Sequence, residues 1–309
     1  MKNLKEYIEE SLLDIDDLIE DDTLFIEKWL EENCDIDGRY VIKNNVVDIV
    51  GNINIRPYTK SIDIQFGEVT GGFSCADSDL TSLKGCPHKC RVFDCSYCDE
   101  LKDLVGCPQT VETLFTCYHC YSLRTLKGAP EKIYTKFICS DCVNLQSLEG
   151  APKEVLEGFH CDGCTSLTSL KGAPNISYCF NCDRCHKLKD LKGCPQKVED
   201  KFSCKKCSNL VSLEGAPITT DWFDCSECNK LKTLEYAPQT VRVFSCNECN
   251  GLKNLVGSPR EVMDNFNCRR CKNLTTLEGA PVWVGCKMDC YGCNKLTKSP
   301  NDPTYRILR

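Results

Sequence analysis

Cysteine pairs are the residues of this 309-residue chain whose type and spacing could do chemistry, since 20 of its 28 cysteines form C-x-x-C pairs. Two such pairs can supply the four thiolates of a structural zinc site. In a secreted protein they would form disulfides, and a pair at a helix N-terminus can catalyse thiol exchange. The ten pairs are Cys95/Cys98, Cys117/Cys120, Cys139/Cys142, Cys161/Cys164, Cys182/Cys185, Cys204/Cys207, Cys225/Cys228, Cys246/Cys249, Cys268/Cys271 and Cys290/Cys293.

A repeat of 20 to 22 residues positions these pairs. Its unit reads F-x-C-x-x-C-x-x-L-x-x-L-x-G-(A/C)-P-x-x-V, and a short fixed period of this kind is typical of a solenoid. The alternation F-x-C puts the ring and the first thiol on one face of a short strand, while Gly and Pro end the apolar return segment. The repeat aromatic lies at positions 73, 93, 115, 137, 159, 180, 202, 223, 244 and 266, with Met288 in the eleventh place.

The position of the C-x-x-C pairs within the repeat decides between zinc binding, disulfides and thiol exchange. Each pair recurs once per coil at the same angular position, so the pairs stack instead of facing one another as zinc knuckles do. Before the repeat proline, Cys86, Cys107 and Cys194 replace the usual alanine, which is how a small buried hydrophobic residue behaves. The pairs leave strands and do not begin helices, which argues against redox catalysis.

An inward ladder of free thiols is therefore the expected arrangement, with no cofactor and no bound metal. A zinc-binding cysteine-rich array stays open as an alternative, and disulfides are a further one. Four cysteines fall off the pattern and are the thiols most expected at the surface: Cys34, Cys90, Cys179 and Cys286.

The unit F-x-C-x-x-C-x-x-L resembles the L-x-L-x-x-(N/C)-x-L core of leucine-rich repeats over about residues 47–296. The resemblance implies an α/β repeat solenoid, leucine-rich-repeat-like, with short parallel strands stacked one per coil. It also implies a mostly irregular convex side, a small helical N-terminal cap, and a second cysteine that contacts backbone in the next coil. The strings Leu80–Pro87 and Leu167–Pro174 also resemble repeat units of tailed-bacteriophage proteins.

The chain divides into four parts. Residues 1–35 are an acidic, helically spaced segment or cap; 36–70 are capping strands and a degenerate first coil; 71–296 hold about eleven repeats; 297–309 form a tail. No long C-terminal cap follows the repeats, and an unpaired strand edge can template association. We therefore expect self-association through the C-terminal edge.

The first ten residues resemble the capsid-targeting leader of internal head proteins in tailed bacteriophages. In that leader the prohead protease cleaves after I-x-E, so Ile8-Glu9-Glu10 makes Glu10 the candidate processing site. This gives an alternative function, that of a virion-internal or structural protein.

Charge and composition exclude several function classes. The net charge is -7, but residues 1–35 carry 13 Asp or Glu against three Lys, so the repeats are nearly neutral. Nucleic-acid binding favours a concentrated stripe of Lys and Arg, and this sequence has no such stripe. No run of 18 apolar residues could cross a membrane, and no secretory signal is recognisable. We expect an intracellular, reducing location in the cytoplasm, or in a virion under the alternative function.

The outward strand positions form the face on which solenoids usually bind partners. Four histidines in unrelated repeat positions and the lack of a catalytic triad or phosphate loop argue against an enzyme, so no catalytic residue is assigned. Mixed charge and a few aromatics suit a protein partner of unknown identity, and large aromatics such as Trp222 and Tyr118 favour binding. The candidate partner-binding residues are Tyr118, His160, Asp162, Asp183, Lys205, Trp222, Asp224, Arg269 and Tyr291.

Overall fold

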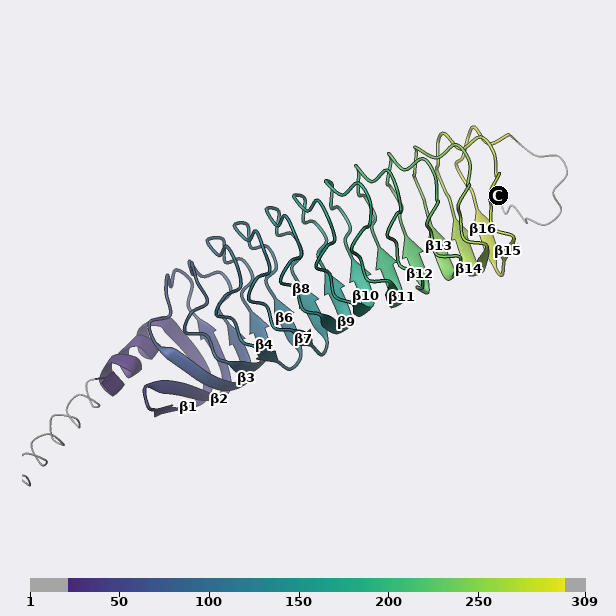
Figure 1. The fold of residues 1–309 in the computed structure, drawn as a ribbon. Coiled ribbons are helices and arrows are strands. Elements are labelled where there is room, and N and C mark those ends of the chain that lie inside the picture. The colour runs from purple at the N-terminus through teal and green to yellow at the C-terminus, as the bar shows by residue number, and fades with distance from the viewer. Residues whose placement is uncertain (1–21, 298–309) are drawn as a thin grey trace, which may run out of the picture.

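A computed structural model describes residues 22–297 as an elongated solenoid (Figure 1). A helix at 22–33 precedes one sixteen-stranded sheet, whose strands run along one side while irregular return segments run along the other. The strands are β1 (Cys34–Lys43), β2 (Val46–Ile55), β3 (Gln65–Ser74), β4 (Lys89–Asp94), β5 (Thr110–Val111), β6 (Leu114–Thr116), β7 (Lys132–Ile133), β8 (Lys136–Ile138), β9 (Glu154–His160), β10 (Ile176–Asn181), β11 (Lys197–Ser203), β12 (Trp222–Asp224), β13 (Thr240–Ser245), β14 (Glu261–Asn267), β15 (Trp283–Val284) and β16 (Lys287–Asp289).

The strand register follows the sequence repeat. β1 and β2 form an antiparallel hairpin, and from β2 onward every pairing is parallel. Ile53 lies opposite Phe73, each repeat phenylalanine lies opposite the next, and Phe266 lies opposite Met288, so twelve positions form one column. The parallel-strand solenoid predicted from the repeat period is confirmed.

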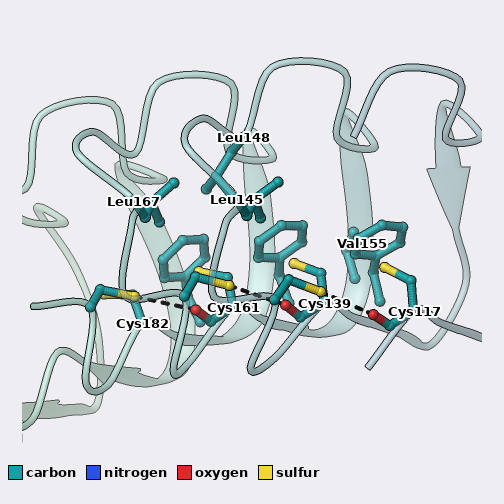
Figure 2. Close-up of a cluster of buried hydrophobic side chains, with 14 of the residues drawn as sticks. Cys117, Cys139, Leu145, Leu148, Val155, Cys161, Leu167 and Cys182 are labelled. Atoms are coloured by element: carbon teal, nitrogen blue, oxygen red, sulfur yellow. Dashed lines mark hydrogen bonds between the residues drawn. The ribbon is translucent and has the colours of Figure 1, made fainter. Parts of the chain in front are cut away.

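Stacked phenyl rings form the centre of the core. From Phe73 to Phe266 the ring centroids of successive coils lie 4.9 to 5.9 Å apart, and every ring is fully buried. Figure 2 shows the leucines of the return segment, such as Leu145 and Leu148, on one side of the rings and the thiols on the other. Since each ring packs on both neighbours, a coil buries its apolar edge only within the stack.

The helix at 22–33 covers the N-terminal end of the ring column. Ile26, Trp29 and Leu30 are buried, and the Trp29 ring lies 6.3 Å from that of Phe66. Phe66 in turn packs at 5.3 Å against Phe73, the first repeat ring. Residues 1–21 of the acidic, helically spaced segment lie outside the described residues.

The α/β character implied by the resemblance is not confirmed, because within residues 22–297 the helix at 22–33 is the only α-helix. The return segments are irregular, since nine of the ten between residues 80 and 281 end at Gly-x-Pro after two leucines, and the tenth has Tyr236 at the glycine position. In a typical coil Gly172 has φ +93°, and a Cβ there would lie 2.6 Å from the Leu148 carbonyl carbon of the preceding coil. Glycine therefore fits this turn best, and Tyr236, with φ +71°, takes its place in one coil.

The C-terminal end of the described sheet is open. β15 and β16 pair with β14, and within residues 22–297 neither has a strand on its other side. Self-association through this edge stays a prediction. In the same part of the chain, no helix combines the length and apolar character needed to span a membrane.

Candidate functional site

A ladder of thiol hydrogen bonds ties the coils together. The second cysteine of each pair donates its S–H to the backbone carbonyl of the first cysteine in the preceding coil, as Cys164 does to Cys139 at 3.1 Å. All ten pairs repeat this bond, at 3.0 to 3.3 Å. The acceptor belongs to the preceding coil. The resemblance to leucine-rich repeats implied a contact with the next coil, so the predicted direction of this contact is wrong. In the first turn Ser78 replaces the thiol and donates to Cys75 of its own coil at 2.6 Å.

Burial raises the pKa of many of these thiols. None of the 28 cysteines forms a disulfide, and 26 of them are buried. Burial raises the pKa of Cys139 well above that of an ordinary thiol, and it raises the pKa of Cys194 to about 12. Because the thiolate is the form that attacks electrophiles and binds metals, thiols with a raised pKa are inert at neutral pH. At the open end of the ladder, hydrogen bonds with Cys268 and Cys271 lower the pKa of Cys293 to about 3. The inward ladder predicted from the repeat is confirmed.

The off-pattern cysteines are only partly where the sequence suggested. Cys286 is exposed and Cys179 is half-buried. Cys34 and Cys90 are buried, so the prediction that they reach the surface is wrong. Cys90 lies in register with the buried Val69 and Val111 of the neighbouring coils and fills a core position that valine fills elsewhere.

The described residues offer no geometry for a metal. Within 22–297 no group of three or more His, Cys, Asp or Glu side chains is arranged to hold an ion. The second thiol of each pair points at a carbonyl of the preceding coil, so successive pairs do not combine into a four-thiolate set. The zinc-array alternative therefore finds no site in this part of the chain.

Two of the predicted partner-binding carboxylates accept hydrogen bonds from groups within the repeats. Asp224 accepts the backbone N–H of Ser226 at 2.9 Å and so caps the turn that follows its strand. Asp183 accepts the Ser203 hydroxyl at 2.6 Å and the backbone N–H of Lys205 at 2.7 Å, which links two coils. Burial raises the pKa of Asp183. Both side chains position turns, whatever else they contact.

A third carboxylate, Asp162, belongs to an ion cluster that spans three coils. It accepts the Ser140 hydroxyl at 2.6 Å, and a guanidinium nitrogen of Arg184 lies 2.9 Å from it. The same nitrogen reaches Asp141, two coils away, at 3.3 Å. Gly163 lies between them, and any Cβ there would collide with the Asp141 carboxylate. A glycine at this turn thus lets one arginine bridge two carboxylates.

The predicted aromatics at the C-terminal half pack against cations. Trp222 is 41% exposed, and the Lys201 ammonium lies 4.7 Å from its ring centroid. The Arg269 guanidinium lies 5.6 Å from the ring centroid of Tyr291, which is exposed. These pairs show that exposed rings on this molecule accept cationic side chains.

His160 lies on the outward face of β9, where it folds over Gly158. A Cβ at Gly158 would lie 2.8 Å from its Nε2 atom, so the glycine makes room for the imidazole. Burial lowers the pKa of His160, while the nearby Asp162 raises it to a smaller extent. The imidazole is therefore neutral near pH 7 and half-buried, which suits a contact residue better than a charged one.

Tyr118 belongs to an aromatic cluster that the sequence did not reveal. The His119 ring lies 5.1 Å from Tyr97, 5.0 Å from Tyr118 and 4.8 Å from Tyr121. Tyr97 and Tyr121 are well exposed. The Nδ1 atom of His119 is buried and has no hydrogen-bond partner in the described part of the chain. Unpaired buried nitrogens are uncommon in folded proteins, so this one marks the cluster for functional testing.

An apolar stripe on the sheet face was missed by the sequence reasoning. Tyr134, Leu156 and Tyr178 are 52%, 45% and 48% exposed, and each directly follows the residue that ends the repeat unit. The register of β7, β9 and β10 places them side by side in three successive coils. At this repeat position most other coils carry polar or charged residues, a contrast that an alignment of the units could have shown. We call these three residues the apolar stripe.

The candidate processing site Glu10 lies outside the described residues, and its cleavage stays a prediction. The nine predicted partner-binding residues do not form one cluster. The structure brings Lys205, Asp224 and Arg269 together along a shallow polar groove of about 270 Å³. Tyr118 and His160 lie in coils nearer the N-terminus.

Comparisons with known proteins give few matches. No protein-family model matches the chain, and a search of curated proteins finds no match. Among solved structures, the chain is similar to a leucine-rich repeat protein from Bacteroides ovatus, with 15% identity and a TM-score of 0.42. The match covers 85% of this chain and 80% of that one. It is the strand order and register of this chain itself that show the solenoid.

Proposed function

We propose that the chain is a non-enzymatic, leucine-rich-repeat-like scaffold that binds a protein partner on the outward face of its sheet. The observation that carries this proposal is the apolar stripe of Tyr134, Leu156 and Tyr178. Three large side chains, each about half exposed, lie in register on a regular surface. Monomeric proteins rarely leave such residues grouped, and tyrosine is enriched where partners bind tightly.

The surroundings of the stripe fit a protein interface with an apolar centre and a polar rim. Lys132 pairs with Glu154 at 2.9 Å, and its ammonium lies 5.2 Å from the Tyr134 ring. The half-buried Cys179 follows Tyr178 on the same strand, and His160 lies on β9 beside it. Neutral and apolar groups thus occupy the middle, and the exposed ion pair lies at one side.

Photocrosslinking tests this assignment. A benzoylphenylalanine placed at Leu156 is expected to crosslink the partner in cells that contain it, because Leu156 lies at the centre of the stripe. The control carries the same group at Val211, which is 47% exposed on the return side. Mass spectrometry of the crosslinked species then identifies the partner and the contact position.

Substitution gives the matching binding measurement. The triple variant Tyr134→Ser/Leu156→Ser/Tyr178→Ser is expected to bind the crosslinked partner at least about 100-fold more weakly, since anchor side chains contribute about 1 to 2 kcal/mol each. The control, Val105→Ser/Val211→Ser/Ile218→Ser, removes three other exposed apolar residues from elsewhere on the solenoid. Equal crosslinking from both positions, or equal binding by both triple variants, would contradict the proposal.

A further inference from the structure

The ten C-x-x-C turns and the Cys75–Ser78 turn before them are joined in one continuous row. In each turn the second of the two residues between the cysteines has positive φ, and its N–H donates to the turn of the next coil. Ten such bonds, from Asp77 N to Ser96 O through Arg270 N to Tyr291 O, measure 2.7 to 3.0 Å. We call this row the turn ridge, and define its turns as residues 75–80, 95–100, 117–122, 139–144, 161–166, 182–187, 204–209, 225–230, 246–251, 268–273 and 290–295.

The turn ridge is acidic along one half and basic along the other. Its first five turns contain six carboxylates and no Lys or Arg, a net charge of -6. Its last six turns contain nine Lys or Arg against three carboxylates, a net charge of +6. The acidic half holds Asp77, Asp79, Asp99, Glu100, Asp141 and Asp162, and the cations of the basic half are Arg184, Lys187, Lys205, Lys206, Lys230, Arg269, Arg270, Lys272 and Lys295.

Ion pairs within the chain leave the outer parts of both halves available. Arg184 neutralises Asp141 and Asp162 near the middle of the ridge. Within residues 22–297, four carboxylates of the acidic half make no ion pair, namely Asp77, Asp79, Asp99 and Glu100. In the same range Lys187, Lys230, Lys272 and Lys295 make none either, whereas Arg269 lies 3.7 Å from Asp289 and Arg270 lies 3.5 Å from Glu248.

We propose that the turn ridge binds a second copy of this chain, antiparallel, with the acidic half of each copy against the basic half of the other. A two-fold axis near the sixth turn brings the second turn of one copy opposite the tenth turn of the other. Asp99 and Glu100 then face Arg269 and Lys272. One partner of this kind satisfies both halves at once, and a two-fold contact closes without forming a filament.

The exposed rings of the acidic half support this choice of partner. Tyr97 and Tyr121 are 46% and 41% exposed and lie in the second and third turns. Arg269 already packs over Tyr291 within this chain, at 5.6 Å. Across the two-fold axis, Arg269 of the second copy would meet the Tyr97 ring in the same manner.

The dimensions predict a weak, salt-sensitive dimer. Ten steps of about 4.8 Å make a ridge roughly 50 Å long. A strip of that length must be about 16 Å wide to bury the 800 Å² per partner of a standard interface. A ridge of tight turns is narrower, so we expect dissociation in the micromolar range and at least about tenfold weaker dimerisation when NaCl rises from about 50 to about 500 mM.

Sedimentation equilibrium of the full chain under reducing conditions tests the proposal. Two charge-reversal variants are used, Asp99→Lys/Glu100→Lys and Arg269→Glu/Lys272→Glu, which change exposed residues at the two ends of the ridge. Each alone is expected to dimerise at least about tenfold more weakly, because like charges then face each other in both copies of the contact. An equimolar mixture is expected to form a heterodimer, since the reversed acidic end meets the reversed basic end.

The control is Lys84→Glu/Lys127→Glu, which makes the same change in net charge as Arg269→Glu/Lys272→Glu at exposed positions away from the ridge. It should dimerise like the wild type, as should the apolar-stripe variant, so a failure here is distinct from a failure of the proposed function. A wild-type chain that stays monomeric at about 100 μM in low salt overturns the inference. The inference is also overturned if neither charge-reversal variant weakens dimerisation, or if the two variants form no heterodimer when mixed. Unchanged circular dichroism and urea midpoints establish that each variant folds.

Discussion

The two cysteines of a repeat are expected to respond in opposite ways to the same substitution. The Cys164 thiol donates to the Cys139 carbonyl at 3.1 Å, whereas the Cys161 thiol makes no hydrogen bond to a carbonyl in the described part of the chain. Both side chains are fully buried. Serine at 164 can still donate to a backbone carbonyl, as Ser78 does to Cys75 of its own coil. Serine at 161 must bury a hydroxyl among apolar groups.

The magnitudes follow from these contacts. Cys164→Ala removes a buried group and its bond and should destabilise the chain by about 1 to 2 kcal/mol, while Cys164→Ser should cost about 0.5 to 1 kcal/mol. For Cys161 the order reverses: Cys161→Ala should cost about 1 kcal/mol and Cys161→Ser about 2 to 3 kcal/mol.

Urea unfolding of the four variants, followed by far-ultraviolet circular dichroism with reductant present, gives these free energies of unfolding. Both positions lie in the same central coil, so end effects and repeat number are matched. The reasoning would be refuted if serine and alanine destabilised the chain in the same order at both positions.

Three further outcomes are expected. Titration of the native, metal-free chain with a thiol reagent should modify Cys286 quickly and Cys179 slowly, and the other 26 thiols only after unfolding; modification of most cysteines at once would contradict the buried ladder. Gly172→Ala should lower the free energy of unfolding by about 2 kcal/mol or more, because φ is +93° and the new Cβ would meet the Leu148 carbonyl at 2.6 Å; an unchanged urea midpoint would show that the coils can move apart. Burial lowers the pKa of His160, so the folded state favours the neutral imidazole and stability is lost as pH falls below about 6.5. The wild type should lose more stability than His160→Gln between pH 7.5 and pH 5, and parallel pH profiles would contradict this.

The repeat made the inward side of the fold predictable. A phenylalanine and two cysteines at fixed spacing specify which side chains stack, and the register from Phe73 to Met288 follows directly. The α/β class was not confirmed, because the resemblance supplied a helical expectation that return segments ending in Gly-x-Pro do not fulfil. Cys90 was assigned to the surface since it lies outside the C-x-x-C pattern, yet it fills a valine position of the core.

The roles of the outward-facing side chains were harder to predict, since they depend on neighbours about twenty residues away in sequence. Asp224 looks like a free surface carboxylate, but its partner is the backbone of Ser226, a local turn bond that residue type alone does not specify. The stripe of Tyr134, Leu156 and Tyr178 becomes visible only when three units are placed side by side in the register of the sheet. Single residues in each unit carry too little signal on their own.

Charge along the turn ridge differs from charge elsewhere on the solenoid in a way that folding does not require. On the sheet face, signs alternate between coils: Lys89 pairs with Glu68 at 2.7 Å and with Glu112 at 3.5 Å, so neighbouring coils attract. On the ridge, Lys205 and Arg270 pair with Glu227 and Glu248 of neighbouring turns, but the first two turns hold four carboxylates and no cation. These like charges repel one another, which weakens the stack slightly. The turns are held by backbone and thiol hydrogen bonds that do not depend on these side chains. Because a stabilising role would interleave the signs, their separation favours a role in meeting another molecule.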